Sequence, residues 1–347
     1  MPSQPGRSTL NVRNATLDDI PRIIALVGKV YPEMGAYSAG MLQGQISNFS
    51  DGQVVVEYDG DIVGYAASFI IDGETALKPH TWDAITGGGY ASRHNAKGEW
   101  LYGMEVCVDP DRRRLRIGQR LYDARKELAE RYELEGIVFG GRMPNWQRKR
   151  KQFPTAKAYL DAVMAQEIAD PVIRFQARMG FEPIGVLKGY LPSDKASRGW
   201  ASHMVWRNPY AVEQKLSANA PPGQKDIVRV ATVQFQQRRV ESFDEFMSNI
   251  EYFVDVTSDY RCDFVVFPEL FTLQLLALEE TRLTPAQSIE RLTEYTPHFV
   301  EKMRELAISY NINIIGGSHP TRTEDDDIQN VAYVFLRDGS VHAQEKI

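Results

Sequence analysis

VDPDRRRLRIGQRL occupies residues 108–121, where an apolar run passes into a helical pattern. Residues 100–110 (WLYGMEVCVDP) are typical of a strand that ends at Pro110. A turn that runs into a helix start offers unpaired N–H groups and the positive end of the helix dipole. The junction therefore predicts a site for a pyrophosphate or a 3′-phosphate, with an ordinary solvated helix start as the alternative. Five arginines crowd it, at positions 112, 113, 114, 116 and 120, and apolar side chains follow at helical spacing: Ile117, Leu121, Ala124, Leu128 and Tyr132.

The segments around this junction alternate between helix and strand patterns. Residues 17–30 suit an amphipathic helix with Thr16 as its N-cap. Residues 53–71 form two apolar-rich runs around Asp-Gly-Asp, which predicts a β-hairpin. Residues 136–141 read as a buried strand, and RFQARMGFEPIG (174–185) as a helix that runs into a further strand. The order predicts a mixed α/β fold.

Composition and charge predict two domains in a soluble, cytoplasmic protein. The chain has 347 residues, is 43% hydrophobic and carries a net charge of −6. It has no apolar run of the roughly 20 residues that a membrane span needs, no secretory signal, and two cysteines in separate segments. Residues 1–219 hold 28 basic and 25 acidic side chains, whereas residues 220–347 hold 12 and 21. Residues 208–226 are polar and contain Pro-Pro-Gly. We therefore expect a domain over 8–208, a linker over 209–226 and a second domain over 227–347.

The order of these segments resembles the GCN5-related N-acetyltransferase (GNAT) superfamily over roughly residues 10–208. The family signature, Arg/Gln-x-x-Gly-x-Gly/Ala, aligns with Arg113, Arg116 and Gly118, and the late Gly-Phe-Glu is the family's second landmark. The resemblance implies a mixed, mostly antiparallel sheet flanked by helices, acetyl-CoA as the cofactor and a small amine as the substrate. The cofactor-binding residues that it implies are Cys107, Val108, Arg113, Arg114, Arg116, Ile117, Gly118 and Gln119.

Two positions depart from the family pattern. The first glycine of the signature is Arg116, which either crowds the diphosphate or adds a cation to it. The tyrosine that often serves as general acid is Gln176, and an amide cannot protonate a thiolate. Either another group donates a proton to the departing thiolate, or the thiolate leaves unassisted, or the domain is a weak catalyst. The candidate donors are left unranked: Tyr102, Tyr159 and Tyr190.

Glu105 is the predicted general base. Strand alternation would place it on one face with Gly103 and Cys107, in an apolar run whose desolvation raises a carboxyl pKa. The alternative is a strand-face carboxylate paired with an arginine or exposed at an edge. Strand N–H groups around Cys107 and Val108, next to the bulge typical of the family, would stabilise the oxyanion.

Two long connections are candidate parts of an acceptor pocket. Residues 80–100 hold His80, Tyr90 and His94, which either contact substrate or are ordinary surface residues. Residues 147–167 begin with a basic run, Arg148 to Lys151. The run lacks the aromatic interleaving of a single-strand platform, so a solvated helix face is favoured over nucleic-acid contact. No metal is expected.

From Val228 onward the chain resembles the nitrilase, or carbon–nitrogen hydrolase, superfamily. VRVATVQF (228–235), CDFVVFPELF (262–271) and the strands within 311–347 agree with the family in order and spacing. The resemblance assigns the catalytic glutamate to Glu269 and the catalytic lysine to Lys346. The family's nucleophilic cysteine follows that lysine, so we expect a partial αββα sandwich from a longer protein, with no hydrolase activity in this chain alone.

Two functions compete for the whole chain. The first is a working N-acetyltransferase that acts on a small amine or amino compound. The second is an amidase or nitrilase-like hydrolase of the full-length protein, whose front domain only binds acyl-CoA or substrate; Gln176 and Arg116 favour it. A nucleic-acid or protein adaptor rests only on the basic runs. Homo-oligomers through the hydrolase part are expected from the resemblance.

Overall fold

The computed structural model describes residues 10–35, 37–211, 228–281, 283–323 and 325–346, apart from the side chains of Arg113 and Arg114. The chain divides into two compact units, here called the N-terminal unit (mainly residues 12–211) and the C-terminal unit (mainly residues 228–346). Most of the predicted linker, 209–226, lies outside the described residues. None of the described helices is long and apolar enough to cross a membrane.

The N-terminal unit is built on a seven-stranded mixed sheet with the order β1-β2-β3-β4-β5-β7-β6. The β4–β5 pair is parallel, whereas β2–β3, β3–β4, β5–β7 and β6–β7 are antiparallel. The mixed, mostly antiparallel α/β fold expected from the sequence is confirmed. The strands are β1 (Leu10–Asn14), β2 (Gln53–Tyr58), β3 (Asp61–Ile71), β4 (Trp100–Val108), β5 (Gly136–Arg142), β6 (Glu182–Leu187) and β7 (Ala201–Arg207).

Local sequence signals explain several element boundaries. The predicted hairpin is confirmed: β2 pairs with β3 across a turn in which Asp59 and Gly60 both have positive φ, 53° and 84°. The predicted first helix begins with a short 3-10 turn, Leu17–Asp19, because the Thr16 N–H and hydroxyl both donate to the Asp19 carboxylate, at 2.8 and 3.1 Å.

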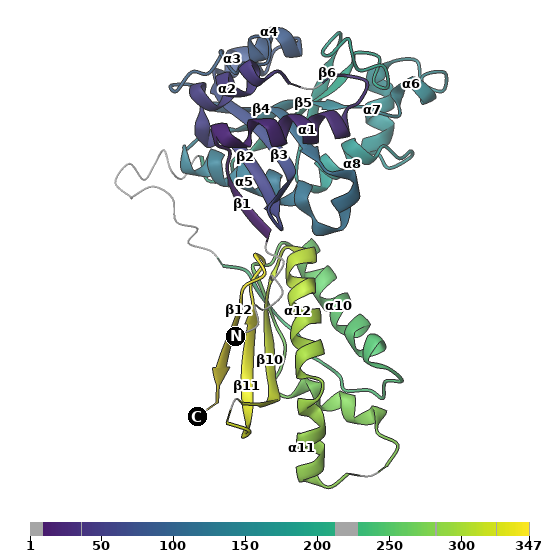
Figure 1. The fold of residues 1–347 in the computed structure, drawn as a ribbon. Coiled ribbons are helices and arrows are strands. Elements are labelled where there is room, and N and C mark those ends of the chain that lie inside the picture. The colour runs from purple at the N-terminus through teal and green to yellow at the C-terminus, as the bar shows by residue number, and fades with distance from the viewer. Residues whose placement is uncertain (1–9, 36, 212–227, 282, 324, 347) are drawn as a thin grey trace. The chain divides into compact units, whose positions relative to one another are not determined.

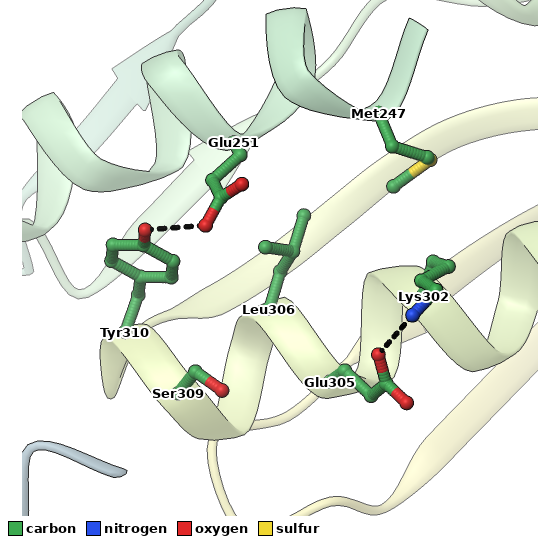
Figure 2. A pocket seen from close by; sticks show the side chains of 7 residues that line it. All are labelled: Met247, Glu251, Lys302, Glu305, Leu306, Ser309 and Tyr310. Carbon is green, nitrogen blue, oxygen red and sulfur yellow. Dashed lines mark hydrogen bonds and ion pairs between the residues drawn. The ribbon is translucent and has the colours of Figure 1, made fainter. Parts of the chain in front are cut away.

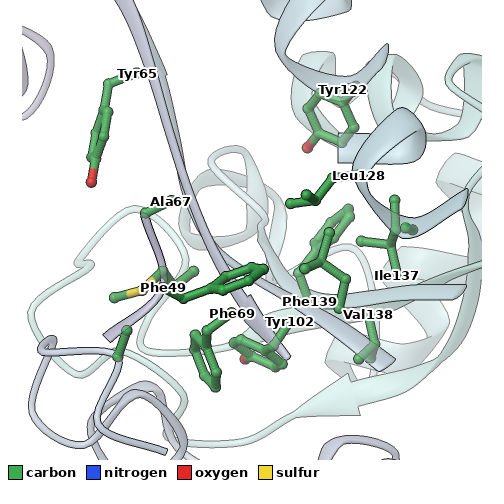
Figure 3. Close-up of a cluster of buried hydrophobic side chains, with 14 of the residues drawn as sticks. Phe49, Tyr65, Ala67, Phe69, Tyr102, Tyr122, Leu128, Ile137, Val138 and Phe139 are labelled. Atoms are coloured by element: carbon green, nitrogen blue, oxygen red, sulfur yellow. The ribbon is translucent and has the colours of Figure 1, made fainter. Parts of the chain in front are cut away.

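Helices cover both faces of this sheet (Figure 1). A Cβ on Gly64 of β3 would lie 2.5 Å from Ile117, so α5 packs directly on the face of the sheet to which Gly64 belongs. The opposite face carries Tyr65, Phe69 and Tyr102, which are fully buried (Figure 3). Side chains of α1 belong to the same core. The helices are α1 (Ile20–Val30), α2 (Ala39–Asn48), α3 (Gly73–Ala76), α4 (Trp82–Thr86), α5 (Ile117–Arg131), α6 (Trp146–Lys149), α7 (Ala156–Met164) and α8 (Pro171–Arg178), with 3-10 turns at Ser50–Gly52 and Pro110–Leu115.

The C-terminal unit contains a five-stranded sheet with the order β12-β11-β10-β9-β8. The strands β8, β9 and β10 run parallel to one another, whereas the pairs β10–β11 and β11–β12 are antiparallel. Its core includes Phe267, Phe271 and Phe299, each almost fully buried. The elements are β8 (Val230–Thr232), α10 (Phe243–Asp259), β9 (Phe264–Val266), a 3-10 helix η4 (Phe271–Leu278), α11 (Pro285–Thr293), α12 (Thr296–Tyr310), β10 (Asn313–Arg322), β11 (Ile328–Phe335) and β12 (Val341–Glu345).

Candidate functional site

A bulge in β4 sets the geometry of the candidate site. Ser68 of β3 pairs with Gly103, yet its neighbour Ala67 pairs with Glu105, so Met104 is an extra residue. Directly paired residues share a face of an antiparallel sheet. Glu105 therefore lies on the face of Ala67, opposite to Gly103. The sequence prediction that Glu105 and Gly103 share a face was wrong, because a bulge shifts the alternation by one residue; the shared face with Cys107 holds.

The strands β4 and β5 diverge at the bulge. Their parallel pairing runs only from Trp100↔Gly136 to Gly103↔Phe139. Past the divergence, side chains bind the carbonyls of β4: the indole N–H of Trp82 donates to Met104 O at 3.1 Å and the Tyr31 hydroxyl to Val106 O at 3.2 Å. Beyond Gly103, no described strand pairs with this edge of β4, so an extended ligand can pair with the backbone there.

The Glu105 carboxylate lies at this opening and is held by two phenols. The hydroxyls of Tyr31 and Tyr37 donate to its two oxygens, each at 3.2 Å. Burial raises the pKa of Glu105, while the two phenols and the Val106 N–H oppose that rise. A carboxylate with a raised pKa at an open edge can accept a proton near neutral pH.

A buried arginine braces the bulge from the other face. Arg125 of α5 is 3% exposed, and its guanidinium donates to Ala67 O at 2.7 Å, to Ser68 Oγ at 2.9 Å and to the carbonyl of Glu105. A Cβ on Gly103 would lie 2.9 Å from the guanidinium, so only glycine leaves room for it. Because a hydrogen bond to one end of a peptide group polarises the other end, Arg125 strengthens the next N–H, that of Val106, as a donor.

Arg142 ends β5 on the same face as Glu105. Its Nε and Nη2 donate to the two oxygens of Asp194, at 2.7 and 2.8 Å, and its Cζ lies 5.3 Å from the centre of the Tyr31 ring. Asp194 is 2% exposed and also accepts from the Ser197 hydroxyl at 2.6 Å. The guanidinium is therefore fixed in orientation while a third of the Arg142 side chain, 33%, remains exposed.

A directed chain of hydrogen bonds lies beside the divergence. His80 Nδ1 lies 2.7 Å from Lys78 O, His80 Nε2 lies 2.8 Å from the Tyr102 hydroxyl, and this hydroxyl lies 2.9 Å from that of Tyr190. Burial lowers the pKa of His80 to about 4, so the ring is neutral. Because a carbonyl only accepts, Nδ1 carries the hydrogen and Nε2 accepts from Tyr102. The Tyr190 hydroxyl then donates to Tyr102, and both phenolic hydrogens point toward His80.

The sequence-predicted phosphate site lies at the N-terminus of α5. Arg116 precedes the helix with a positive φ of 46°. Ile117 is buried against Gly64, and a Cβ on Gly118 would lie 3.2 Å from the Phe175 ring, so this glycine admits close contact with α8. Gln119 follows in the first turn, while the side chains of Arg113 and Arg114 lie outside the described part of the structure.

The two remaining β4 residues of the predicted set differ in orientation. Cys107 is 2% exposed, pairs with Tyr65, and has a pKa raised by burial. The Asp109 N–H donates to Val63 O of β3 at 2.8 Å. By strand alternation, the amides of Val106 and Val108 therefore face the opening rather than β3. The Val106 N–H donates to the Glu105 carboxylate, so the structure favours the N–H of Val108, and not that of Cys107, as the oxyanion donor.

Gln176, at the position of the family's tyrosine, is buried beside β5. Its Nε2 donates to the Tyr122 hydroxyl at 3.3 Å, and within the described residues its Oε1 has no hydrogen-bond partner. Of the other candidate acids, Tyr159 donates to Asp170 at 2.6 Å and belongs to a separate core cluster with Trp146. His94 accepts from the Ile70 N–H at 3.2 Å and stacks on Phe49, a structural role for a predicted surface residue.

In the C-terminal unit the structure brings Glu269 and Lys346 together, although 76 residues lie between them. Lys346 Nζ lies 2.6 Å from Glu269 Oε1, which also accepts from Asn330 Nδ2 at 2.9 Å. Lys346 lowers the pKa of Glu269. Over the described residues, no group of three or more His, Cys, Asp or Glu side chains could hold a metal ion.

A groove between α10 and α12 is a separate feature of the C-terminal unit. Figure 2 shows Glu251 accepting from the Tyr310 hydroxyl at 2.6 Å and Lys302 paired with Glu305 at 2.8 Å. Neither Glu269 nor Lys346 lines it. The charged side chains that line it are paired with one another or with Tyr310 within the groove.

Known families match both units. Residues 28–150 match the acetyltransferase (GNAT) family, and residues 229–347 match the carbon–nitrogen hydrolase family. An uncharacterized N-acetyltransferase of Bacillus subtilis, YkwB, is 32% identical over 205 residues, which cover 90% of that protein and 58% of this chain. This chain belongs to the GNAT family. Its C-terminal unit is a carbon–nitrogen hydrolase domain segment.

Two further relatives define how far the likeness reaches. The probable hydrolase YhcX of B. subtilis is 39% identical over 340 residues, or 97% of this chain, and the chain spans 64% of its length. The loading GNATL domain of CurA from Lyngbya majuscula shares the GNAT fold, with a TM-score of 0.51 at 20% identity over 58% of this chain and 98% of that one.

Several residues of the GNAT site escaped the sequence analysis. Tyr31, Tyr37, Arg125 and Arg142 reach the site from four separate segments, and no local spacing links them to Glu105. Asn330 of the hydrolase segment was missed for the same reason. The sequence shows only that these positions are basic or aromatic, which does not indicate that they meet at one site.

Proposed function

We propose that the N-terminal unit is an N-acetyltransferase that transfers the acetyl group of acetyl-CoA to a small amine. The observation that carries the proposal is the divergence of β4 from β5 beside Glu105, with the arginine-rich start of α5 at the end of the same strand. The acetyl-pantetheine arm would lie along β4 in the opening. The diphosphate would be bound by the N–H groups around Arg116, Ile117 and Gly118, with Arg113, Arg114 and Gln119 at its edge.

The chemistry follows from the groups around the opening. Glu105 accepts a proton from the acceptor ammonium, and the freed amine attacks the thioester carbonyl carbon. The N–H group of Val108, which faces the opening, holds the oxyanion of the tetrahedral intermediate. The attacking nitrogen loses its second proton to solvent, the C–S bond breaks, the amide forms, and CoA leaves as a thiolate.

The structure supports unassisted departure of the thiolate. Gln176 carries no transferable proton, Tyr159 is bonded to Asp170, and the phenolic hydrogens of Tyr102 and Tyr190 are directed toward His80. A thiol of pKa near 8.5 ionises readily, so its thiolate is an adequate leaving group near neutral pH. Solvent supplies the last proton.

The test is product formation. Purified protein, acetyl-CoA and a library of primary amines are incubated, and CoA thiol and acetylated amine are quantified by absorbance and mass spectrometry. Equimolar CoA and acetylated product are expected. Thiol release without any acetylated amine, at the rate of the enzyme-free reaction, would refute the proposal.

A second function is favoured by the Glu269–Lys346 contact. We propose that the full-length protein hydrolyses a carbon–nitrogen bond, with Glu269 as base toward a nucleophilic thiol and Lys346 as oxyanion partner. Asn330 of β11 donates a hydrogen bond to the Glu269 carboxylate. Amide turnover by the full-length protein, lost in Lys346→Ala, tests this; turnover unchanged in that variant would contradict it.

A further inference from the structure

The face of the GNAT sheet that carries Glu105 also carries a cation. β5 and β7 pair Gly140 with His203 and Arg142 with Ala201, and a Cβ on Gly140 would lie 2.3 Å from the Tyr190 ring. Gly140 and Arg142 alternate onto the same face. The Tyr190 hydroxyl is hydrogen-bonded to that of Tyr102. Tyr102 pairs with Phe69 of β3, and Phe69 lies on the same face of the sheet as Glu105. Arg142 and Glu105 thus end the two diverging strands on one face.

Tyr31 joins the two groups. Its hydroxyl donates to Glu105 at 3.2 Å, while its ring faces the Arg142 guanidinium, whose Cζ lies 5.3 Å from the ring centre. One tyrosine side chain thus spans from the proton acceptor to the cation. An α-amino acid carries its amine and its carboxylate on one carbon, so one small molecule can present a proton to Glu105 and an anion to Arg142 at the same time.

The pairing with Asp194 orients Arg142 and leaves part of the guanidinium available. Asp194 takes Nε and Nη2, and no described residue accepts a hydrogen bond from Nη1. A purely structural role, in which Arg142 anchors the loop after β6, would explain its ion pair with Asp194. It does not account for the 33% exposure of Arg142 on the face that Glu105 occupies. A fixed guanidinium edge beside an aromatic ring is suited to bind a carboxylate.

We propose that the acceptor is an amino acid, whose carboxylate binds Arg142 and whose ammonium loses its proton to Glu105. This inference rests on the proposed acetyltransferase function and narrows its substrate class. A carboxylate at Arg142 could also come from a dicarboxylic acyl group on CoA. The acceptor is favoured because Tyr31 links Arg142 directly to the general base.

The test compares matched acceptors. Each L-amino acid is assayed with acetyl-CoA against its own amide, which keeps the amine and removes the carboxylate charge. Wild-type protein is expected to prefer the acid by about 10- to 100-fold in kcat/KM, the effect of a charged hydrogen-bond partner. Arg142→Gln is expected to remove this preference, mainly by raising KM for the acid.

Two further variants keep the test decisive. Arg142→Lys retains a cation for Asp194 if Arg142→Gln fails to fold, and it is expected to lose most of the preference because it lacks the guanidinium fork. Arg148→Gln, an exposed arginine on α6, is the matched control and is expected to behave as wild type. A second arm uses succinyl-CoA in place of acetyl-CoA, with the amide acceptors.

The outcomes separate the inference from the function on which it rests. Amides turned over as well as acids, or acetyl-CoA bound with neither turned over, would overturn the amino-acid assignment. An Arg142→Gln defect confined to succinyl-CoA would assign the carboxylate to the acyl donor and also overturn it. Failure of wild-type protein to bind acetyl-CoA would instead overturn the proposed function.

Discussion

The Asp170 carboxylate joins the start of α8 to α7, and its removal should lower the free energy of unfolding. The side chain is 0% exposed. It caps α8 by accepting from the N–H groups of Val172 and Ile173, at 3.1 and 3.3 Å, and it accepts from the Tyr159 hydroxyl at 2.6 Å. Loss of the cap costs about 1 kcal/mol, and a buried phenol left without a partner costs about 1–3 kcal/mol. Asp170→Ala should therefore lower the free energy of unfolding by about 2–4 kcal/mol.

Urea denaturation followed by tryptophan fluorescence measures this loss. The five tryptophans of the chain lie at positions 82, 100, 146, 200 and 206, so the signal reports the GNAT unit alone. The control is Asp161→Ala, an acid 56% exposed that pairs with Lys157 and should contribute within about 0.5 kcal/mol.

A double-mutant cycle identifies the source of the loss. Tyr159→Phe should cost about 1 kcal/mol less in the Asp170→Ala background than in wild type, because the hydrogen bond is already gone. Strict additivity, or a loss for Asp170→Ala no larger than that of the control, would refute this reasoning.

Three further predictions concern titrating groups. Glu105→Gln should lower kcat/KM by about 10²- to 10⁴-fold. It should also abolish the acidic limb of the rate–pH profile, whose pKa lies above the ordinary carboxyl value of 4.5 because Glu105 is buried. A retained acidic limb would contradict the role of Glu105 as base. Because the folded pKa of His80 is about 4 and its ordinary value 6.5, the unfolded chain binds the proton first, so stability should fall as pH drops through this window. His80→Gln should flatten that fall in fluorescence-monitored denaturation, and an unchanged slope would count against it. Lys346→Met should raise the pKa of Glu269, measured by carboxyl NMR, since Lys346 holds it down; no rise would show that the contact is absent in solution.

Local patterns predicted the elements of the fold well. Asp59 and Gly60 fix a hairpin turn through their own backbone preferences, and the spacing from Ile117 to Leu128 defines a helix. The family likeness assigned Glu269 and Lys346 to one catalytic site, and the structure places the two side chains in contact. These features depend on near neighbours or on a shared fold.

Register and long-range contacts set the limit of that prediction. The bulge at Met104 moves Glu105 to the face opposite Gly103, and the buried guanidinium that hydrogen-bonds to it, that of Arg125, comes from a later helix. Alternation within β4 gives no sign of it. Likewise, the approach of Arg142 and Tyr31 is a product of sheet order rather than of spacing.

Isothermal titration with acetyl-CoA tests the central claim, that the GNAT unit binds an acyl-CoA at the opening of β4 and the start of α5. Wild-type protein, Arg113→Ala/Arg116→Ala and the control Arg148→Ala/Arg150→Ala are compared, with fluorescence confirming that each is folded. Micromolar binding by wild type and control, lost in the Arg113/Arg116 variant, is the predicted result. Folded wild-type protein that binds no acetyl-CoA would contradict the account.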